Sequence, residues 1–307
     1  MDQPITFQGN SRPAIFGEVL FDVFPDGSER LGGAPFNVAW HLQALGLNPL
    51  LISRVGNDAE GRQVLDAMHV WGMDTSGVQT DTAHPTGTVK VDIYRGEPSY
   101  TILPSQAYDF IDYAQAQRAV EHIPIALLYH GTLIARSSSS YQVLQALRTH
   151  LKCPVFVDIN LRSPWWSGGI VESTLRGAQW VKMNGQELAE IVNSPVLETA
   201  QVGNVARELG ERYQLQLLVV TLGAEGAYFV TQDKADYALA NKVEVVDSVG
   251  AGDAFSAVTL LGLMRTWPLL LTQQRALEFA AAICRIPGAL SHDPVFYREY
   301  RTRWEME

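Results

Sequence analysis

Cysteine is scarce in this sequence, and long apolar runs are missing. Cys153 and Cys284 are the two cysteines among 307 residues, and their separation gives no CxxC pair. A disulfide framework and a cysteine-based zinc site are therefore excluded, and we expect two buried thiols in a reducing cytosol. No apolar run approaches the ~20 residues that cross a membrane, and the N-terminal MDQPITFQGN lacks the basic segment and apolar core of a secretory signal. These absences predict a cytoplasmic protein that does not enter a membrane.

Positive charge is also scarce. The chain has 23 Lys and Arg residues against 33 Asp and Glu residues, and its formal net charge is −10. Nucleic acid binding depends on clustered Lys and Arg side chains, and the sequence contains no basic run of that kind. The composition therefore excludes a nucleic acid partner, and an anionic ligand would have to be bound by local hydrogen-bond donors.

What the sequence does contain is a regular alternation of short apolar runs and amphipathic stretches. The predicted strands are residues 13–16, 50–55, 126–129, 155–158, 180–183 and 217–221. The predicted helices are residues 37–45, 61–69, 140–151, 186–191 and 202–213. Strands joined by helices of this length form right-handed crossovers and a mainly parallel sheet that is covered on both faces. Because there is no repeat and no long linker, residues 1–307 are expected to form a single α/β domain.

Two segments, residues 18–31 and 86–103, have no helical period. The second of them, TGTVKVDIYRGEPSYTIL, alternates apolar and polar residues around a Gly-Glu-Pro turn. This pattern indicates an antiparallel hairpin with one solvated face. We expect the two segments to form a small β lid near the carboxyl ends of the sheet strands.

The stretch VVDSVGAGDAFSA, residues 245–257, places two glycines and an aspartate at the start of a predicted helix. Neither a Walker A motif nor a dinucleotide fingerprint fits, since no Lys follows the glycines and the third glycine of the fingerprint is missing. The N–H groups of Gly250, Ala251 and Gly252 could instead face a phosphoryl group. Asp253 then has two interpretations: it compensates the helix dipole as a cap, or it is a general base for the hydroxyl that attacks the phosphoryl group.

Polar residues and glycines mark the carboxyl ends of several other predicted strands. GGAPFNVAWHLQALG begins at Gly32 and contains Asn37, GEVLFD ends at Asp22, and VDINLR, VKMNGQEL and TLGAEG follow later strands. Each segment also has a plain structural interpretation, as a turn, as a loop that enters a helix or, for Asn184 and Glu187, as a helix-capping pair. Open α/β sheets place their ligands at the carboxyl ends of their strands. The shared position of these segments therefore indicates one ligand site.

Taken in order, these segments resemble the ribokinase-like (PfkB) family of carbohydrate kinases, and within it the bacterial fructokinases. GGAPFNVAWHLQALG, the following RVGNDAEGR and the later DSVGAGDAF carry the resemblance. GEVLFD, the hairpin, YHGTL, DINLR, KMNGQE and TLGAEG occur in the family's order as well, and the resemblance covers about residues 15–290. It implies an α/β fold, a ribokinase-like three-layer sandwich with a mainly parallel central sheet and a small β-hairpin lid.

The resemblance also implies roles on the acceptor side of the site. Asp22, Gly32, Gly33 and Asn37 would bind sugar hydroxyls. Asp253 would deprotonate the hydroxyl that receives the phosphoryl group, which favours the second of its two interpretations.

On the phosphoryl and nucleotide side, the resemblance implies ATP as donor and Mg2+ as cofactor. Glu187 would position Mg2+ through water, and Asp247 with neighbouring carbonyls would bind K+. Arg162 would reach toward the substrate or the transferred phosphate. The anion hole would be formed by Gly250, Ala251 and Gly252. The nucleotide side would be lined by Lys182, Asn184, Glu187, Thr221, Gly223 and Gly226.

The implied reaction is ATP-dependent phosphorylation of a sugar, with D-fructose as the leading acceptor. A kinase of the same family for aminoimidazole riboside, 2-keto-3-deoxygluconate or another furanose is the alternative, and the hairpin tip at residues 95–97 and Phe36 are expected to affect the choice. A non-catalytic sugar-binding regulator is disfavoured because Asp253 and the anion-hole glycines are all present. Relatives often dimerise through their lids, so residues 89–94 predict a homodimer interface or, alternatively, a lid packed over its own site.

Overall fold

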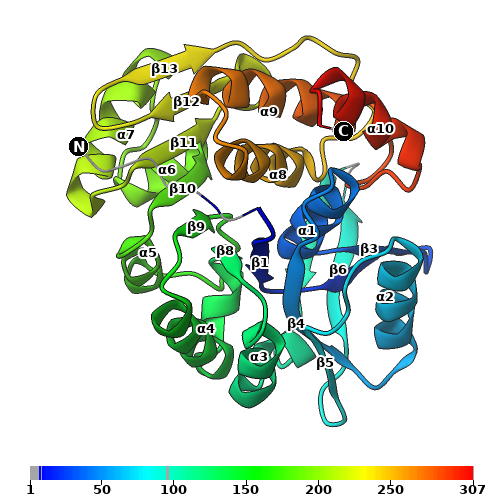
Figure 1. Ribbon diagram of the computed structural model, residues 1–307. Helices are drawn as coiled ribbons and strands as arrows, with labels where there is room; N and C mark the ends of the chain where they lie inside the picture. The colour runs from blue at the N-terminus through cyan, green and yellow to red at the C-terminus, as the bar shows by residue number, and fades with distance from the viewer. Residues whose placement is uncertain (1–6, 8, 95–96, 307) are drawn as a thin grey trace.

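The computed structural model describes residues 7, 9–94 and 97–306, and within them the chain forms two β-sheets (Figure 1). The strands of the larger sheet are β1 (Arg12–Phe16), β4 (Leu50–Gly56), β5 (Val78–Asp81), β8 (Ile125–Gly131), β9 (Val155–Asp158), β10 (Trp180–Asn184), β11 (Leu217–Thr221), β12 (Ala227–Val230) and β13 (Ala235–Ala238). Those of the smaller sheet are β2 (Leu20–Val23), β3 (Glu29–Gly32), β6 (Gly87–Tyr94) and β7 (Glu97–Ile102).

The larger sheet has the order β13-β12-β11-β10-β9-β8-β1-β4-β5. Every pair from β11 to β5 is parallel, whereas β12 and β13 are antiparallel to their neighbours. All six predicted strands are present, and the expected mainly parallel sheet is confirmed. The parallel pairs put the carboxyl ends of the strands at one edge.

Helices cover both faces of this sheet. On one side lie α1 (Ala34–Ala44), α2 (Ala59–Val70), α8 (Ala251–Met264), α9 (Leu269–Ile283) and α10 (Pro294–Arg303). On the other side lie α3 (Tyr113–Val120), α4 (Ser138–Leu151), α5 (Gly168–Leu175), α6 (Gly185–Ile191) and α7 (Thr199–Tyr213). Short 3-10 turns are η1 (Ala107–Phe110), η2 (Leu133–Arg136) and η3 (Gly223–Glu225).

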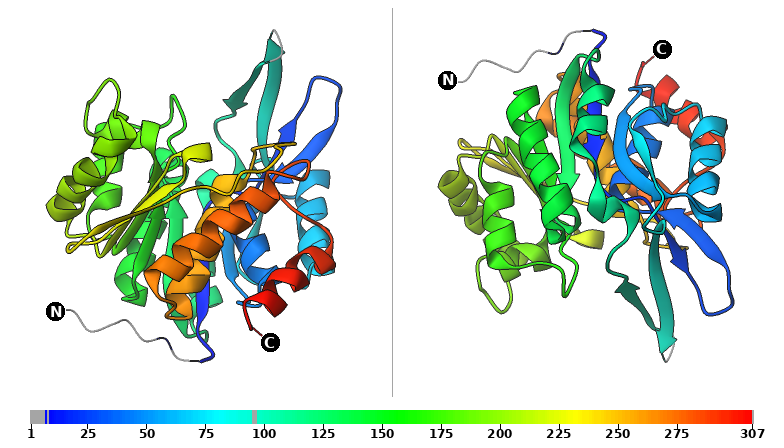
Figure 2. Two further views of the ribbon diagram at one scale, coloured as in Figure 1. Left: turned by 90° about the horizontal axis from the view of Figure 1, so that it is seen from above. Right: turned by 90° about the horizontal axis from the view of Figure 1, so that it is seen from below.

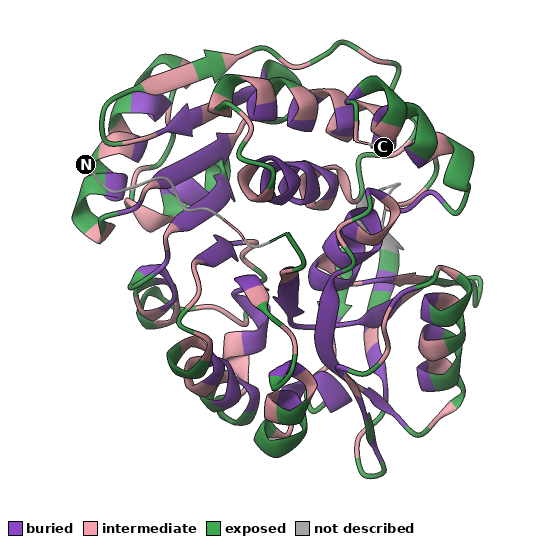
Figure 3. Ribbon diagram, viewed as in Figure 1, coloured by how far each residue is buried: buried purple, intermediate pink, exposed green. Residues whose placement is uncertain are grey.

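The central strands are buried on both faces, which explains their apolar sequences (Figure 3). Leu128 of β8 packs with the α3 and α4 side, and the next residue, Tyr129, packs with the α1 and α8 side; neither is exposed. A strand that is covered on both faces has to be apolar at successive positions. The resulting three layers are the predicted sandwich.

The smaller sheet stands out from the body at one end of the molecule (Figure 2). Its order is β3-β2-β6-β7, and the parallel pairing of β2 with β6 joins the two hairpins into one sheet. Val89 and Val91 of β6 are buried, while Lys90 and Asp92 are exposed. The two segments predicted as a lid therefore form it together. Of the predicted hairpin tip at residues 95–97, residues 95 and 96 lie outside the described residues.

Both cysteines are free, and neither is fully buried, so the expectation of two buried thiols is wrong. Burial still raises the pKa of the Cys153 thiol to about 11. No helix in the described part of the chain is long and apolar enough to span a membrane.

Candidate functional site

The start of α8 has the backbone that an anion site requires. Gly250 is the N-cap of the helix and has φ 77°, and a Cβ on it would lie 2.3 Å from the Cβ of Ala289, so the position demands glycine. The first N–H groups of a helix have no partner within it and point toward an anion. Ala251 and Gly252 belong to this first turn. Gly250, Ala251 and Gly252 therefore have the backbone geometry that phosphoryl binding requires, and that role stays a prediction.

Asp253 lies in the first turn of α8 and is held from another helix. Asn37 of α1 donates a hydrogen bond from Nδ2 to Asp253 Oδ2 at 2.7 Å. No side-chain hydrogen bond caps α8, so Asp253 does not act as a hydrogen-bonding cap. The contact joins residues 216 positions apart, which brings the two most specific sequence segments together.

The predicted acceptor residues surround one point. A Cβ on Gly32 would lie 3.8 Å from Asn37 Oδ1 and 3.8 Å from Asp22 Oδ2. Asn37 is 5% exposed, and its Oδ1 has no hydrogen-bond partner among the described residues. A buried acceptor of this kind needs a donor. A ligand hydroxyl beside Gly32 would supply one, so the geometry suits a polyhydroxylated ligand.

Burial dominates the electrostatics of the site carboxyl groups. It raises the pKa of Asp253 to about 6, although the hydrogen bond from Asn37 and the charges of Lys182 and Arg162 oppose the shift. Burial likewise raises the pKa of Asp22 to about 6, again opposed by Arg162. Arg162 thus lies within electrostatic range of both predicted acceptor-side carboxyl groups.

Glu18 is a third carboxyl group of the site, and the sequence analysis gave it no role. It lies between β1 and β2, is 4% exposed, and burial raises its pKa to about 7. Arg162 and Asp253 are among the charges that act on it. The available signal was an acidic residue in the otherwise apolar segment GEVLF.

Lys182 is buried beside the start of α8. Its Nζ donates to Asp158 Oδ1 at 3.1 Å and to Oδ2 at 2.9 Å, and it lies 3.1 Å from the position that a Cβ on Gly252 would occupy. Burial alone would lower the pKa of Lys182, but Asp158 together with Glu187 and Asp253 raises it. A charged ammonium group therefore lies next to the predicted phosphoryl-binding turn.

Asn184 and Glu187 form the capping pair that the spacing allowed. Asn184 Oδ1 accepts the Glu187 N–H at 2.8 Å, and Glu187 Oε2 accepts the Asn184 N–H at 2.8 Å. Glu187 Oε1 also accepts the N–H of Leu161 at 2.8 Å. The capping interpretation is confirmed, and each carboxylate oxygen keeps a lone pair for a further donor.

Thr221 is the last residue of β11, and Gly223 and Gly226 lie in the turn between β11 and β12. Thr221 is in register with Asn184 on the neighbouring β10, so this turn borders the capping pair. Gly226 has φ 129°, and a Cβ on it would lie 2.0 Å from the carbonyl oxygen of Ala238. The close backbone approach explains the glycine.

Asp247 connects the glycine-rich loop to the lid. Its Oδ1 accepts the Val249 N–H at 3.0 Å, and its Oδ2 accepts the Gly288 N–H at 2.9 Å. Arg30 of β3 lies 3.5 Å from the same Oδ2. A fixed positive charge from the lid therefore already faces the predicted K+ ligand.

Phe36 does not line the site. It has no exposed surface, and its ring packs on Trp40 with centroids 5.8 Å apart. An effect of Phe36 on the choice of acceptor would therefore be indirect, through the packing of α1 in the core.

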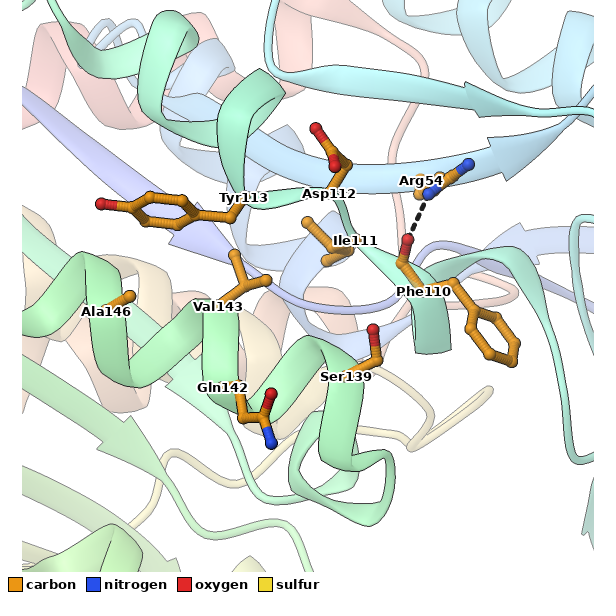
Figure 4. Close-up of a pocket in the computed structure, with 9 residues that line it drawn as sticks. All are labelled: Arg54, Phe110, Ile111, Asp112, Tyr113, Ser139, Gln142, Val143 and Ala146. Atoms are coloured by element: carbon orange, nitrogen blue, oxygen red, sulfur yellow. Dashed lines mark hydrogen bonds between the residues drawn. The ribbon is translucent and has the colours of Figure 1, made fainter.

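A separate hollow of about 520 Å³ lies between η1, α3 and α4 (Figure 4). Arg54, Asp112 and Gln142 are among its lining residues, and Arg54 donates to the carbonyl of Phe110. None of the predicted site residues lines this hollow; they lie at the carboxyl edge of the large sheet instead.

Known proteins with similar sequences are carbohydrate kinases. Residues 12–294 match the model of the pfkB family carbohydrate kinases. A fructokinase of Salmonella typhimurium is 30% identical over 297 residues, which cover 92% of this chain and 93% of the relative. A fructokinase of Klebsiella pneumoniae is 32% identical over 276 residues, 83% of this chain and 85% of the relative.

Among solved structures, a fructokinase of Vibrio cholerae O395 in a form with bound fructose, ADP and calcium has a TM-score of 0.78. It is 26% identical, and the match covers 92% of this chain and 96% of that one. The match with the family model spans both glycine-rich segments and the lid. The chain belongs to the PfkB family of carbohydrate kinases.

Proposed function

We propose that this protein is an ATP-dependent fructokinase in which Asp253 is the general base. The observation that carries the proposal is the Asn37–Asp253 hydrogen bond, because it joins the acceptor residue Asn37 to a half-buried carboxylate in the first turn of α8. Asp22, Asn37 and the backbone of Gly32 and Gly33 bind the sugar. Asp253 then accepts the proton of the hydroxyl that attacks the γ-phosphoryl group.

The phosphoryl group is stabilised by positive partial and full charges. A phosphoryl transition state spreads negative charge over its equatorial oxygens, so preorganised N–H groups lower its energy. The N–H groups of residues 250–252 supply this stabilisation. Arg162 adds a further positive charge, which acts on the carboxyl groups of Asp22 and Asp253. Asn184, Thr221, Gly223 and Gly226 are proposed to contact the nucleotide.

Mg2+ bound with ATP supplies charge neutralisation on the transferring group. The described residues contain no group of three or more His, Cys, Asp or Glu side chains that could hold an ion directly. Mg2+ in such sites keeps several of its waters, and the remaining lone pairs of Glu187 fit a contact through water. We propose K+ near Asp247, where an ion would share the carboxylate with Arg30.

Fructose is favoured as the acceptor by the fructokinase relatives at about 30% identity. The test is an ADP-release assay with Mg-ATP across D-fructose, 2-keto-3-deoxygluconate, aminoimidazole riboside, D-ribose and D-glucose. We expect the highest kcat/KM with D-fructose. A higher value for another sugar would reject fructose but keep the kinase. Absence of ADP with every sugar, together with calorimetric sugar binding, would indicate a non-catalytic regulator.

The activity is expected to rise with pH through a midpoint near 6. Only the ionised Asp253 accepts a proton, and its pKa is about 6. The measurement is kcat/KM for the sugar between pH 5 and pH 8 at constant ionic strength. A flat profile below pH 7 would contradict the assignment of Asp253 as base.

Stability is expected to change in the opposite direction over the same range. Glu18, Asp22 and Asp253 have pKa values of about 7, 6 and 6 in the folded protein, above their ordinary values of 4.5, 3.8 and 3.8. The folded state therefore binds more protons than the unfolded state between about pH 4 and pH 7, and the contribution of these groups to the free energy of unfolding falls as pH rises. Urea unfolding at each pH measures it.

We propose two arrangements for the lid, which differ in oligomeric state. Val89 is buried in a cluster with Leu20, Ile102 and Leu133, as a lid packed over its own site requires. The exposed Lys90 and Asp92 would form part of the interface in a homodimer through the lid. Light scattering distinguishes a monomer from a dimer.

A further inference from the structure

Asp158 is a buried carboxylate at the end of β9 that binds groups from three other elements. It is 1% exposed. Lys182 of β10 donates to both of its oxygens, Ser256 of α8 donates to Oδ2 at 2.7 Å, and the hydroxyl of Tyr129 on β8 lies 3.4 Å from Oδ2. One carboxylate therefore ties the strand that carries Lys182 to the helix that carries Asp253 and Gly252.

The place of the Lys182 ammonium group calls for an explanation. It lies beside the first turn of α8, 3.1 Å from the Cβ position of Gly252. The N-terminus of a helix carries partial positive charge and repels a cation. The energetic conflict is relieved when an anion lies between the ammonium group and the helix, as a transferring phosphoryl group would. Asp158 holds the cation there through both of its oxygens.

We propose that Asp158 is a positioning residue for phosphoryl transfer, which fixes the Lys182 ammonium group beside Gly252 and, through Ser256, fixes it relative to α8. The inference rests on the proposed kinase function and adds a part to it. Asp158 acts on the phosphoryl group through Lys182 and through α8. The competing view is that Asp158 and Lys182 form a buried ion pair that serves folding alone.

The two views predict different kcat values for the double variant Asp158→Asn/Lys182→Met. Asp158→Asn alone is expected to lower kcat about 100-fold while the sugar KM changes less than about 3-fold, and it lowers the unfolding midpoint because Lys182 is left buried without its partner. In the double variant both charges are gone, so the unfolding midpoint recovers while kcat stays at the value of Lys182→Met alone. The proposal would be overturned if the double variant recovered kcat together with stability. It would also be overturned if the loss of kcat in the double variant equalled the product of the losses in the two single variants.

Ser256 offers a milder variant with a matched control. Ser256→Ala removes one hydrogen bond to Asp158 and is expected to lower kcat about 10-fold, with the sugar KM unchanged. Ser53→Ala is the control, because Ser53 of β4 is also a buried serine with no exposed surface and its hydroxyl has no partner among the described residues. Equal kcat values for the two variants would overturn the link through Ser256.

Nucleotide binding separates failure of this inference from failure of the proposed function. Calorimetry without sugar is expected to show that Asp158→Asn and Lys182→Met each weaken the binding of a non-hydrolysable ATP analogue more than the binding of ADP. The reason is that Lys182 faces the terminal phosphoryl group, which ADP lacks. Equal losses for both nucleotides would overturn the placement of Lys182. Lack of ADP release by the unmodified protein with every sugar would instead reject the kinase function.

Discussion

Replacement of Asp253 by Asn is expected to lower kcat about 1,000-fold, within the range that a general base contributes, while the affinity for ATP stays within about 2-fold. The amide cannot accept the proton of the attacking hydroxyl. The N–H groups of residues 250–252 and Lys182 are unchanged, so the phosphoryl side keeps its charge distribution. The measurements are single-turnover rates with D-fructose and calorimetric titration with ATP.

Asp253→Asn should leave the fold intact, which makes the kinetic result interpretable. Asn keeps the shape of Asp, and its Oδ1 can accept the hydrogen bond that Asn37 donates. At pH 7 the ionised Asp253 is disfavoured by burial, since its pKa is about 6 in the folded protein, and a neutral amide avoids that cost. We therefore expect an unchanged or higher unfolding midpoint.

The control is Asp233→Asn, at an exposed position in the turn between β12 and β13, where we expect no change in rate or stability. Retention of more than a tenth of kcat by Asp253→Asn would reject the general-base assignment. Asp253 would then serve only to compensate the dipole of α8.

The strands that could be predicted from the sequence are those that the fold covers on both faces. Residues 155–157 and 217–220 are apolar throughout because helices pack on both sides of β9 and β11. β5, β12 and β13 are not among the six predicted strands, and of these β5 and β13 form the two edges of the sheet. The edge sequences, VQTD and ADYA, contain few large apolar side chains, so no apolar run marks them, whereas the apolar AYFV of β12 is only four residues long.

The sequence could assign the candidate site residues to one edge of the sheet because parallel strands bring their carboxyl ends together there. The partners of each side chain could not be predicted in the same way. Asn37 contacts Asp253, and Arg30 of the lid contacts Asp247. Each contact joins segments that are far apart in the sequence, so it depends on how the helices and the hairpin are oriented in space. The capping pair Asn184–Glu187 was foreseen because its two members are three residues apart on one helix turn.

Alanine substitutions at the adjacent Gly32 and Gly33 are expected to affect different properties. Gly33 has φ 106°, and a Cβ there would lie 2.8 Å from the carbonyl oxygen of Glu18. Backbone strain of this kind costs about 1–3 kcal/mol, and the overlap with a buried carbonyl adds to it. Gly33→Ala should therefore lower the free energy of unfolding by at least about 2 kcal/mol, as measured by urea denaturation.

Gly32→Ala should leave stability unchanged and weaken sugar binding. A Cβ at this position meets only Asn37 Oδ1 and Asp22 Oδ2, each at 3.8 Å, which is ordinary van der Waals contact. The methyl group fills the space between these two oxygens, where the sugar hydroxyls are proposed to bind. Overpacking of that size costs about 1–3 kcal/mol, so the KM for fructose is expected to rise about 10- to 100-fold while the KM for ATP stays constant.

The contrast between neighbouring glycines tests the acceptor site without touching a charged group. If Gly32→Ala kept the sugar KM of the unmodified protein, the sugar would not bind in the space between Asp22 and Asn37. The backbone fixes the direction of the Cβ, so the methyl group has to occupy that space. If both variants lost stability equally, the prediction that a methyl group fits at Gly32 without strain would be wrong. A rise in fructose KM confined to Gly32→Ala, with a loss of stability confined to Gly33→Ala, would place the acceptor sugar against Asp22 and Asn37.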